Sequence, residues 1–118
     1  MKKALFLALI ALNSTFAISD GEIQANNRCV NGSAKDCEIL GELYAYKNDY
    51  SQAAPYFQRS CELSRANGCY NLAILYLNGH GVAQSPAATR YYAGKACELG
   101  HQSGCEIYDR LKKFNNLW

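Results

Sequence analysis

The sequence of 118 residues has little net charge, few histidines and no long apolar run outside its N-terminal region. Twelve lysines and arginines stand against ten aspartates and glutamates, which gives a formal net charge of +2. A chain this close to neutrality lacks the basic surface typical of nucleic-acid-binding proteins. The only histidines are His80 and His101, and we expect both to be exposed loop residues rather than general bases. Beyond the N-terminal region, no segment is apolar over the roughly 20 residues that a membrane-spanning helix needs.

The N-terminal segment has the pattern of a secretory signal peptide. Two lysines precede an unbroken apolar run, Ala4 to Leu12, which is too short to span a membrane. Small residues follow, and cleavage is expected after Ala17 or after Ser19. The alternative is a buried N-terminal helix. Cleavage leaves a domain of residues 20–118 with equal numbers of basic and acidic residues, located in the periplasm or outside the cell.

Six cysteines define the organisation of the chain. They form three pairs with eight-residue spacing, and equivalent cysteines recur after 32 and then 36 residues. This regularity indicates structural repeats, and an even number of cysteines in a secreted chain indicates disulfides. Reactive thiols are the weaker interpretation, because redox motifs favour two cysteines separated by two residues. The pairs are Cys29 and Cys37, Cys61 and Cys69, and Cys97 and Cys105.

Each repeat is predicted to contain two helices, A and B. Residues at i, i+3, i+4 and i+7 from the second cysteine of a pair are apolar or small, as on one face of an amphipathic helix A. Helix B ends at the next cysteine. The helix A residues are Cys37, Leu40, Gly41 and Tyr44 in the first unit, and Cys69, Leu72, Ala73 and Tyr76 in the second.

The start of helix B is indicated by capping residues. Ser85 followed by Pro86 is typical of a helix N-terminus, and Asp49 occupies the equivalent position in the first unit. If Asp49 is the cap, Pro55 lies inside the helix and removes a hydrogen bond; otherwise the helix begins later, near Ser51. Helix A is joined to helix B by a longer, glycine-marked connection in the second unit, which accounts for the unequal repeat lengths.

The cysteine spacing implies a chain reversal within each pair. Residues eight apart on one helix are separated by about 12 Å along its axis, too far for a disulfide. Asn67, Gly68 and Gly100 are therefore predicted to lie in turns. Six cysteines allow many pairings in principle, but the repeat favours local bridges that join the end of helix B to the next helix A. Closing a loop of about nine residues contributes ~2–3 kcal/mol.

The chain resembles the Sel1-like repeat family, and most closely its cysteine-rich branch, the Helicobacter cysteine-rich proteins. The similarity is carried by CYNLAILY at 69–76, GHGV at 79–82, KACELG at 95–100 and the final Gly104-Cys105. It implies an all-α, tetratricopeptide-like superhelix of antiparallel helix pairs stapled by disulfides. Two full repeats are expected at about 37–68 and 69–104, with partial repeats at both ends.

The resemblance also implies an alternative activity, because some proteins of this branch are described as slow β-lactamases or penicillin binders. The sequence contains neither the Ser-x-x-Lys nor the Lys-Thr-Gly motif of serine β-lactamases. It also lacks the His-x-His-x-Asp-His cluster of zinc β-lactamases. Cys97 and His101 have a spacing that could serve a metal, but Cys105 is the expected partner of Cys97. We therefore expect no catalytic residue, metal or cofactor.

The favoured function is protein or peptide binding through the concave face of the A helices. Four tyrosines, at 44, 56, 76 and 92, recur at positions expected in the core. Partner contacts are expected at helix A positions that the repeat does not need for packing; the alternative is that some of these side chains are buried by neighbouring helices or simply solvated. These candidates are Glu38, Ile39, Glu42, Tyr46, Tyr70, Asn71, Ile74 and Asn78.

Three further expectations concern assembly and the C-terminus. A monomer is expected. An immunity-type protein that neutralises a periplasmic partner is a third functional hypothesis, with the same binding mechanism. A closing helix A is predicted from Cys105 to Phe114, and Phe114, Leu117 and Trp118 either fold back on the core or contact a partner.

Overall fold

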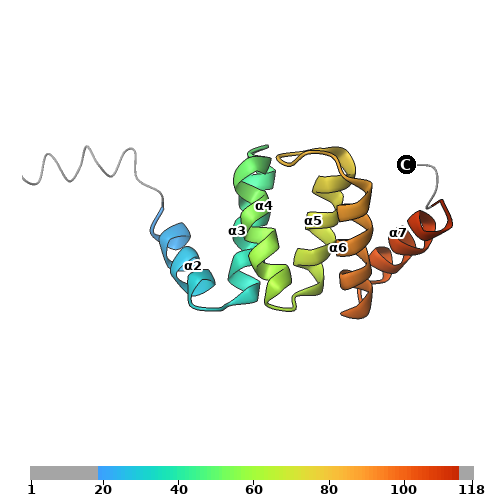
Figure 1. Ribbon diagram of the computed structural model, residues 1–118. Coiled ribbons are helices and arrows are strands. Elements are labelled where there is room, and N and C mark those ends of the chain that lie inside the picture. The colour runs from blue at the N-terminus through green and yellow to red at the C-terminus, as the bar shows by residue number, and fades with distance from the viewer. Residues whose placement is uncertain (1–18, 115–118) are drawn as a thin grey trace, which may run out of the picture.

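The computed structural model describes residues 19–114, and this part of the chain is helical with no strand. The helices stand side by side in chain order (Figure 1). The predicted signal peptide, apart from Ser19, and the predicted contact residues Leu117 and Trp118 lie outside the described residues. The helices are α2 (Asp20–Val30), α3 (Ala34–Tyr46), α4 (Tyr50–Glu62), α5 (Ala66–Asn78), α6 (Pro86–Glu98) and α7 (Gln102–Lys113).

The helices alternate between the two predicted types. Helices α3, α5 and α7 are A helices, and α2, α4 and α6 are B helices, so the described chain contains two A–B pairs flanked by one helix at each end. The all-α architecture of antiparallel pairs is confirmed. Helix α7 starts three residues earlier than Cys105, and Phe114 follows its last turn as a half-exposed residue.

Side-chain caps set the start of both full-length B helices. The Asp49 carboxylate accepts a hydrogen bond from the Gln52 amide, and the Ser85 hydroxyl accepts one from the Ala88 amide at 3.1 Å. Asp49 is therefore the cap of α4, and the later start near Ser51 is wrong. Pro55 lies inside α4 with its ring exposed to solvent.

Each turn from helix B to helix A is closed by a disulfide. The bridges are Cys29–Cys37, Cys61–Cys69 and Cys97–Cys105, with Cα–Cα distances of 4.7, 4.4 and 4.5 Å. The third residue after the first cysteine has a positive φ in every turn: Gly32 (104°), Ser64 (66°) and Gly100 (95°). The chain reverses at this residue because a left-handed conformation breaks the helix.

The prediction that Asn67 and Gly68 form a turn is wrong. Both lie in the first turn of α5, and the reversal occurs earlier, at Ser64. Gly68 is instead required for close contact between α4 and α5, since a Cβ atom there would lie 2.4 Å from the Ser60 hydroxyl oxygen. The prediction for Gly100 is confirmed.

The connections from helix A to helix B differ as expected. Three residues separate α3 from α4, whereas residues 79–85 separate α5 from α6. This longer loop extends from the top of α5 and α6 back toward the first repeat (Figure 1). Gly81 (φ 72°) is in close contact with α4, because a Cβ atom there would lie 2.3 Å from the backbone carbonyl of Tyr50. The loop therefore joins the two repeats in addition to connecting its own helices.

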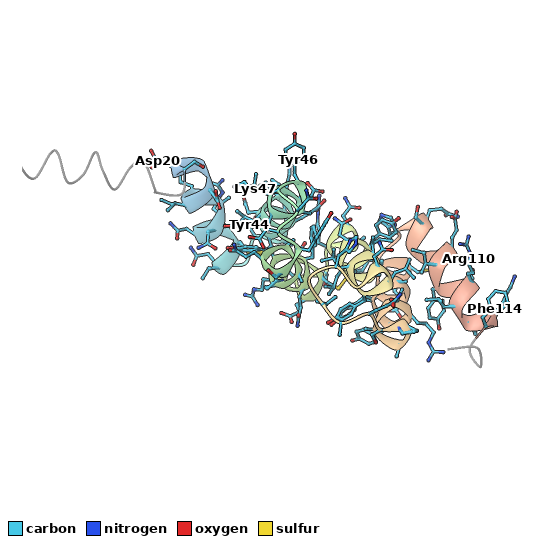
Figure 2. The ribbon with its side chains drawn as sticks, turned by 90° about the horizontal axis from the view of Figure 1, so that it is seen from above. Asp20, Tyr44, Tyr46, Lys47, Arg110 and Phe114 are labelled. Carbon is cyan, nitrogen blue, oxygen red and sulfur yellow. A yellow bond between two sulfur atoms is a disulfide. The ribbon has the colours of Figure 1, made fainter. Side chains whose placement is uncertain are left out.

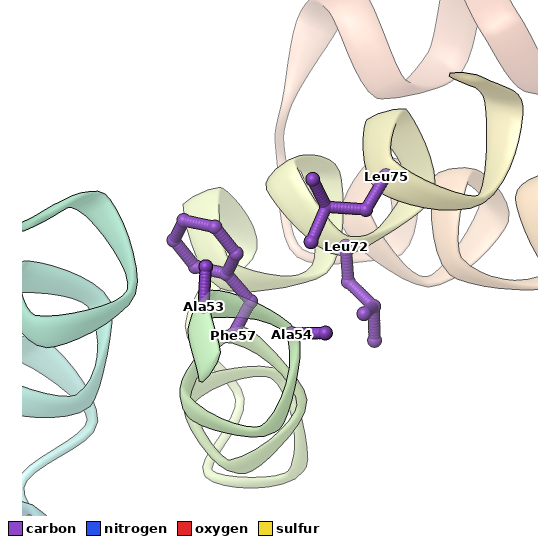
Figure 3. Close-up of a cluster of buried hydrophobic side chains, with 5 residues drawn as sticks. All are labelled: Ala53, Ala54, Phe57, Leu72 and Leu75. Carbon is purple, nitrogen blue, oxygen red and sulfur yellow. The ribbon is translucent and has the colours of Figure 1, made fainter. Parts of the chain in front are cut away.

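The largest core cluster lies between α4 and α5 (Figure 3). Phe57, only 2% exposed, packs with Ala53 and Ala54 of α4 and with two leucines of α5. On its other side it contacts Gly41 of α3, where a Cβ atom would lie 2.5 Å from the ring. The small residue of the repeat pattern thus admits a large aromatic ring from the neighbouring helix.

The four repeat tyrosines form two stacked pairs that are half-buried beside the core. Tyr44 stacks on Tyr56 and Tyr76 on Tyr92, each with ring centroids 5.6 Å apart. Tyr44 also donates a hydrogen bond of 2.6 Å to the Glu22 carboxylate of α2. This bond to an anion is the main reason that the pKa of Tyr44 is raised to about 12.

Candidate functional site

A groove of about 490 Å³ lies between α3, the first turns of α4, and α5. The A helices form two of its walls, and the loop after α5 contributes at one end. Apolar, aromatic and amide groups predominate among its side chains. The lining residues are Glu42, Ala45, Tyr46, Tyr50, Phe57, Asn71, Ile74, Leu75, Asn78 and His80.

Five predicted partner-contact residues line this groove. They come from equivalent faces of consecutive A helices, where residues three or four apart lie on the same side. Tyr46 is 88% exposed and points away from the helices (Figure 2). Asn71 and Ile74 are half-buried in the groove wall. The five residues are Glu42, Tyr46, Asn71, Ile74 and Asn78.

Glu38 is not a partner-contact residue, because the next repeat covers it. Its side chain is 6% exposed, and its carboxylate accepts hydrogen bonds from Arg65 and, at 2.9 Å, from Asn67. Arg65 precedes α5 and makes no side-chain capping bond there. The ion pair therefore links α3 to the N-terminus of α5.

Tyr70 occupies the equivalent position one repeat later and makes an equivalent contact. Its ring stacks on His101 with centroids 4.2 Å apart, and it does not line the groove. His101 is the N-cap of α7, where its Nδ1 accepts a hydrogen bond of 3.2 Å from the Gly104 amide. His101 is thus a capping and stacking residue, which corrects the expectation of an exposed loop histidine. Ile39 remains about half-exposed but does not line the groove either.

Sequence reasoning did not assign Tyr50 and His80 to the groove. Tyr50 begins α4, and His80 belongs to the loop after α5, so the two are far apart in the chain. Their rings stack with centroids 4.7 Å apart. The only sequence signal was the extra length of the connection after α5. The structure explains this length, because the loop reaches α4 and places Gly81 in close contact with the Tyr50 backbone.

One carboxylate carries the formal charge of the groove. Among the described lining residues, Glu42 is the only aspartate or glutamate, and none is lysine or arginine. Partial burial raises the pKa of Glu42, and the neighbouring Glu38 carboxylate raises it further, against an opposing effect of Arg65. The groove is therefore mildly acidic at its first-repeat end.

A second cavity, of about 610 Å³, lies between α6 and α7. It combines the exposed ring of Tyr91 with Arg90, Lys95 and Glu98 of α6 and Tyr108 of α7. Cys97 also lines this cavity but is held in its disulfide. The described lining of the two cavities contains no serine and no free thiol.

Residues 19–114 contain neither a metal-binding cluster nor a membrane-spanning helix. No group of three or more histidine, cysteine, aspartate or glutamate side chains within residues 19–114 is arranged to hold a metal ion. None of the helices in this range is long and apolar enough to cross a membrane.

The alternating A and B helices define a helical-repeat scaffold. The family model for the Sel1 repeat matches residues 38–64 and 66–101, which together exceed half of the chain. The chain therefore belongs to the Sel1 repeat family. The matched ranges correspond closely to the two A–B pairs, α3 with α4 and α5 with α6.

Relatives of this chain include Helicobacter cysteine-rich proteins, as expected. The chain is 37% identical over 51 residues to beta-lactamase HcpA of Helicobacter pylori, an alignment covering 43% of this chain and 20% of that protein. It is 39% identical over 51 residues to HcpC of the same species, whose β-lactamase name is provisional, covering 43% and 18%.

A eukaryotic relative shares more of the chain. Cytochrome c oxidase assembly factor 7 of Xenopus tropicalis is 32% identical over 77 residues, which cover 64% of this chain and 33% of that protein. The chain thus spans a third or less of the length of these relatives.

Proposed function

We propose that this Sel1 repeat protein binds an extended segment of a partner protein in the groove between α3 and α5. The observation that carries the proposal is the combination of groups from two consecutive repeats on one surface. Tyr46 and Ile74 offer apolar contact area, while the amides of Asn71 and Asn78 can donate to and accept from a peptide backbone.

Rigidity of the scaffold supports the same proposal. Each turn from helix B to helix A is closed by a disulfide, and the loop contact at Gly81 holds the second repeat against the first. A groove that is already formed loses little conformational entropy when a ligand binds, so more of the contact energy is available as affinity.

The test is partner capture with matched variants of the oxidised protein. We expect Asn71→Ala with Ile74→Ala to lose partners that the unchanged protein retains. Tyr91→Ala, an exposed aromatic at the second cavity, is the control and should retain them. Identical partner sets for the groove variant and the unchanged protein would show that the groove does not bind.

A second candidate is β-lactam hydrolysis, which the similarity to beta-lactamase HcpA favours. The described cavity linings contain no serine or free cysteine to act as a nucleophile. Turnover of penicillin by the purified protein decides between the two functions. Multiple turnovers that persist after contaminating enzymes are removed would establish the hydrolase.

Secretion is part of the proposal. It is supported by the signal-peptide pattern of the sequence and by the three disulfides, which form in oxidising compartments. Intact-mass analysis of the exported protein should find an N-terminus at Ile18 or Asp20.

The third hypothesis is that the partner is a toxic periplasmic protein, which this chain neutralises by binding it in the groove. Co-expression of this chain with such a toxic protein should then restore growth only when the groove is unaltered.

A further inference from the structure

We propose that the groove selects a partner segment in which a lysine or arginine lies next to an apolar residue. This inference rests on the proposed function, since it names the chemistry of the segment that the groove takes. It is carried by the charge balance at one end of the groove and by the residue at the equivalent position in the next repeat.

Two carboxylates share a single cation at the first-repeat end. Glu38 is already paired with the Arg65 guanidinium and also accepts a hydrogen bond from Asn67. Glu42 lies one helical turn further along α3 and faces the groove. With both carboxylates ionised, the cluster of Glu38, Glu42 and Arg65 has a net charge of −1, and Glu42 is exposed in the groove lining.

The other groups around Glu42 do not supply that cation. The titratable side chains lining the groove besides Glu42 are Tyr46 of α3, Tyr50 of α4 and His80 of the loop. The His80 ring is stacked on Tyr50. Arg65, which faces the cluster from the N-terminus of α5, is bonded to Glu38. Tyr46 lies one helical turn after Glu42 on α3, and its exposed ring offers a face to a ligand cation.

The second repeat supplies the apolar part of the specificity. Ile74 lies 32 residues after Glu42, at the equivalent position of the next A helix, and lines the same groove. Leu75 and Phe57, both almost fully buried, form the floor of the groove beside Ile74. Consecutive repeats thus present a carboxylate and an aliphatic side chain at matching positions, which suits a basic residue followed or preceded by an apolar one. The aliphatic stem of lysine or arginine can itself pack on this surface.

The experiment is selection from a random heptapeptide library displayed on phage, against the full oxidised protein. We expect selected peptides to be enriched in lysine or arginine beside an apolar residue. A synthetic copy of the most enriched peptide should bind Glu42→Gln about fivefold more weakly, the upper value for a partly exposed ion pair. Glu106→Gln, which removes an exposed carboxylate on α7, should not change the affinity.

Charge reversal and a peptide variant complete the test. Replacing the basic residue of the peptide with glutamine should weaken binding to the unchanged protein but not to Glu42→Gln. Glu42→Lys should reverse the preference toward a peptide carrying glutamate at that position.

The possible failures are distinguishable. If peptides are selected and Ile74→Ala weakens them, but neither basic enrichment nor an effect of Glu42→Gln is found, the charge inference is wrong and the groove still binds peptides. If no peptide is selected, or Ile74→Ala binds selected peptides unchanged, the proposed function fails and this inference fails with it.

Discussion

Replacement of Gly41 by alanine tests how the two repeats accommodate different residues at the same helix contact. In the first repeat Gly41 contacts the Phe57 ring, where an alanine Cβ would lie 2.5 Å from two ring carbons. In the second repeat the equivalent residues, Ala73 and Ala93, are both fully buried. A small residue on α3 is thus matched with a large one on α4, and two small residues are matched on α5 and α6.

The magnitude follows from the packing. Unstrained carbon atoms are about 3.5–4.0 Å apart, so the Phe57 ring would have to move by roughly 1 Å. Because the ring is only 2% exposed and surrounded by core side chains, this overpacking should cost about 1–3 kcal/mol. Alanine is favoured over glycine inside a helix by about 1 kcal/mol. The net effect of Gly41→Ala should be a loss of about 0–2 kcal/mol in the free energy of unfolding.

The effect should change sign when the ring is absent. In a Phe57→Ala protein the added Cβ meets no ring, so Gly41→Ala should stabilise by about 1 kcal/mol, its helix-propensity gain. Urea denaturation of the unchanged protein, the two single variants and the double variant measures the coupling between the two substitutions. The comparison requires that the unfolding free energy depends on urea concentration with the same slope in all four proteins. We expect a coupling of about 1–3 kcal/mol. Equal effects of Gly41→Ala in both backgrounds would refute the packing argument.

Three further predictions concern other described residues. Ser64→Gly should raise the free energy of unfolding by about 0.5–1 kcal/mol in urea titrations, because glycine relieves the positive φ of Ser64; an unchanged midpoint would contradict this. Glu38→Ala should lower the free energy of unfolding by about 1–2 kcal/mol, a moderate loss because Arg65 can turn to solvent. In the Glu38→Ala protein, the further change Arg65→Ala should lower the free energy of unfolding by less than Arg65→Ala does alone. Hydrogen bonding from Gln52 lowers the pKa of Asp49, so the stability contributed by ionised Asp49 is fully present above its unfolded-state pKa and is lost as the pH falls through its lower folded-state pKa. Asp49→Asn should therefore weaken the loss of unfolding free energy at acidic pH, and a pH profile identical to that of the unchanged protein would contradict this.

Most of the fold could be predicted because its signals are local. The apolar spacing of the A helices, the caps at Asp49 and Ser85, and the lengths of the connections depend only on neighbouring residues. The prediction of a turn at residues 67–68 was wrong because a glycine can serve either a turn or a close helix contact, and sequence alone does not distinguish the two. Gly68 permits a close helix contact, while Ser64 takes the left-handed conformation.

The candidate site was predictable only in part. The faces of the A helices identified the five predicted groove residues, since helical periodicity decides which side chains share a face. Whether a face is open depends on the next repeat. The N-terminus of the following A helix covers Glu38 through Arg65 and contacts Tyr70 through His101, and these contacts join residues about 30 positions apart.

The sequence by itself therefore determined the repeat: its helices, its register and the presence of a chain reversal between the two cysteines of each pair. These follow from periodicity and from the limited reach of a disulfide. Tertiary structure decided which residues remain exposed to a partner. The loop after α5 brings His80 onto Tyr50, and each repeat buries part of the preceding helix A. Such contacts depend on how one repeat is oriented on the next, which no local pattern in the chain encodes.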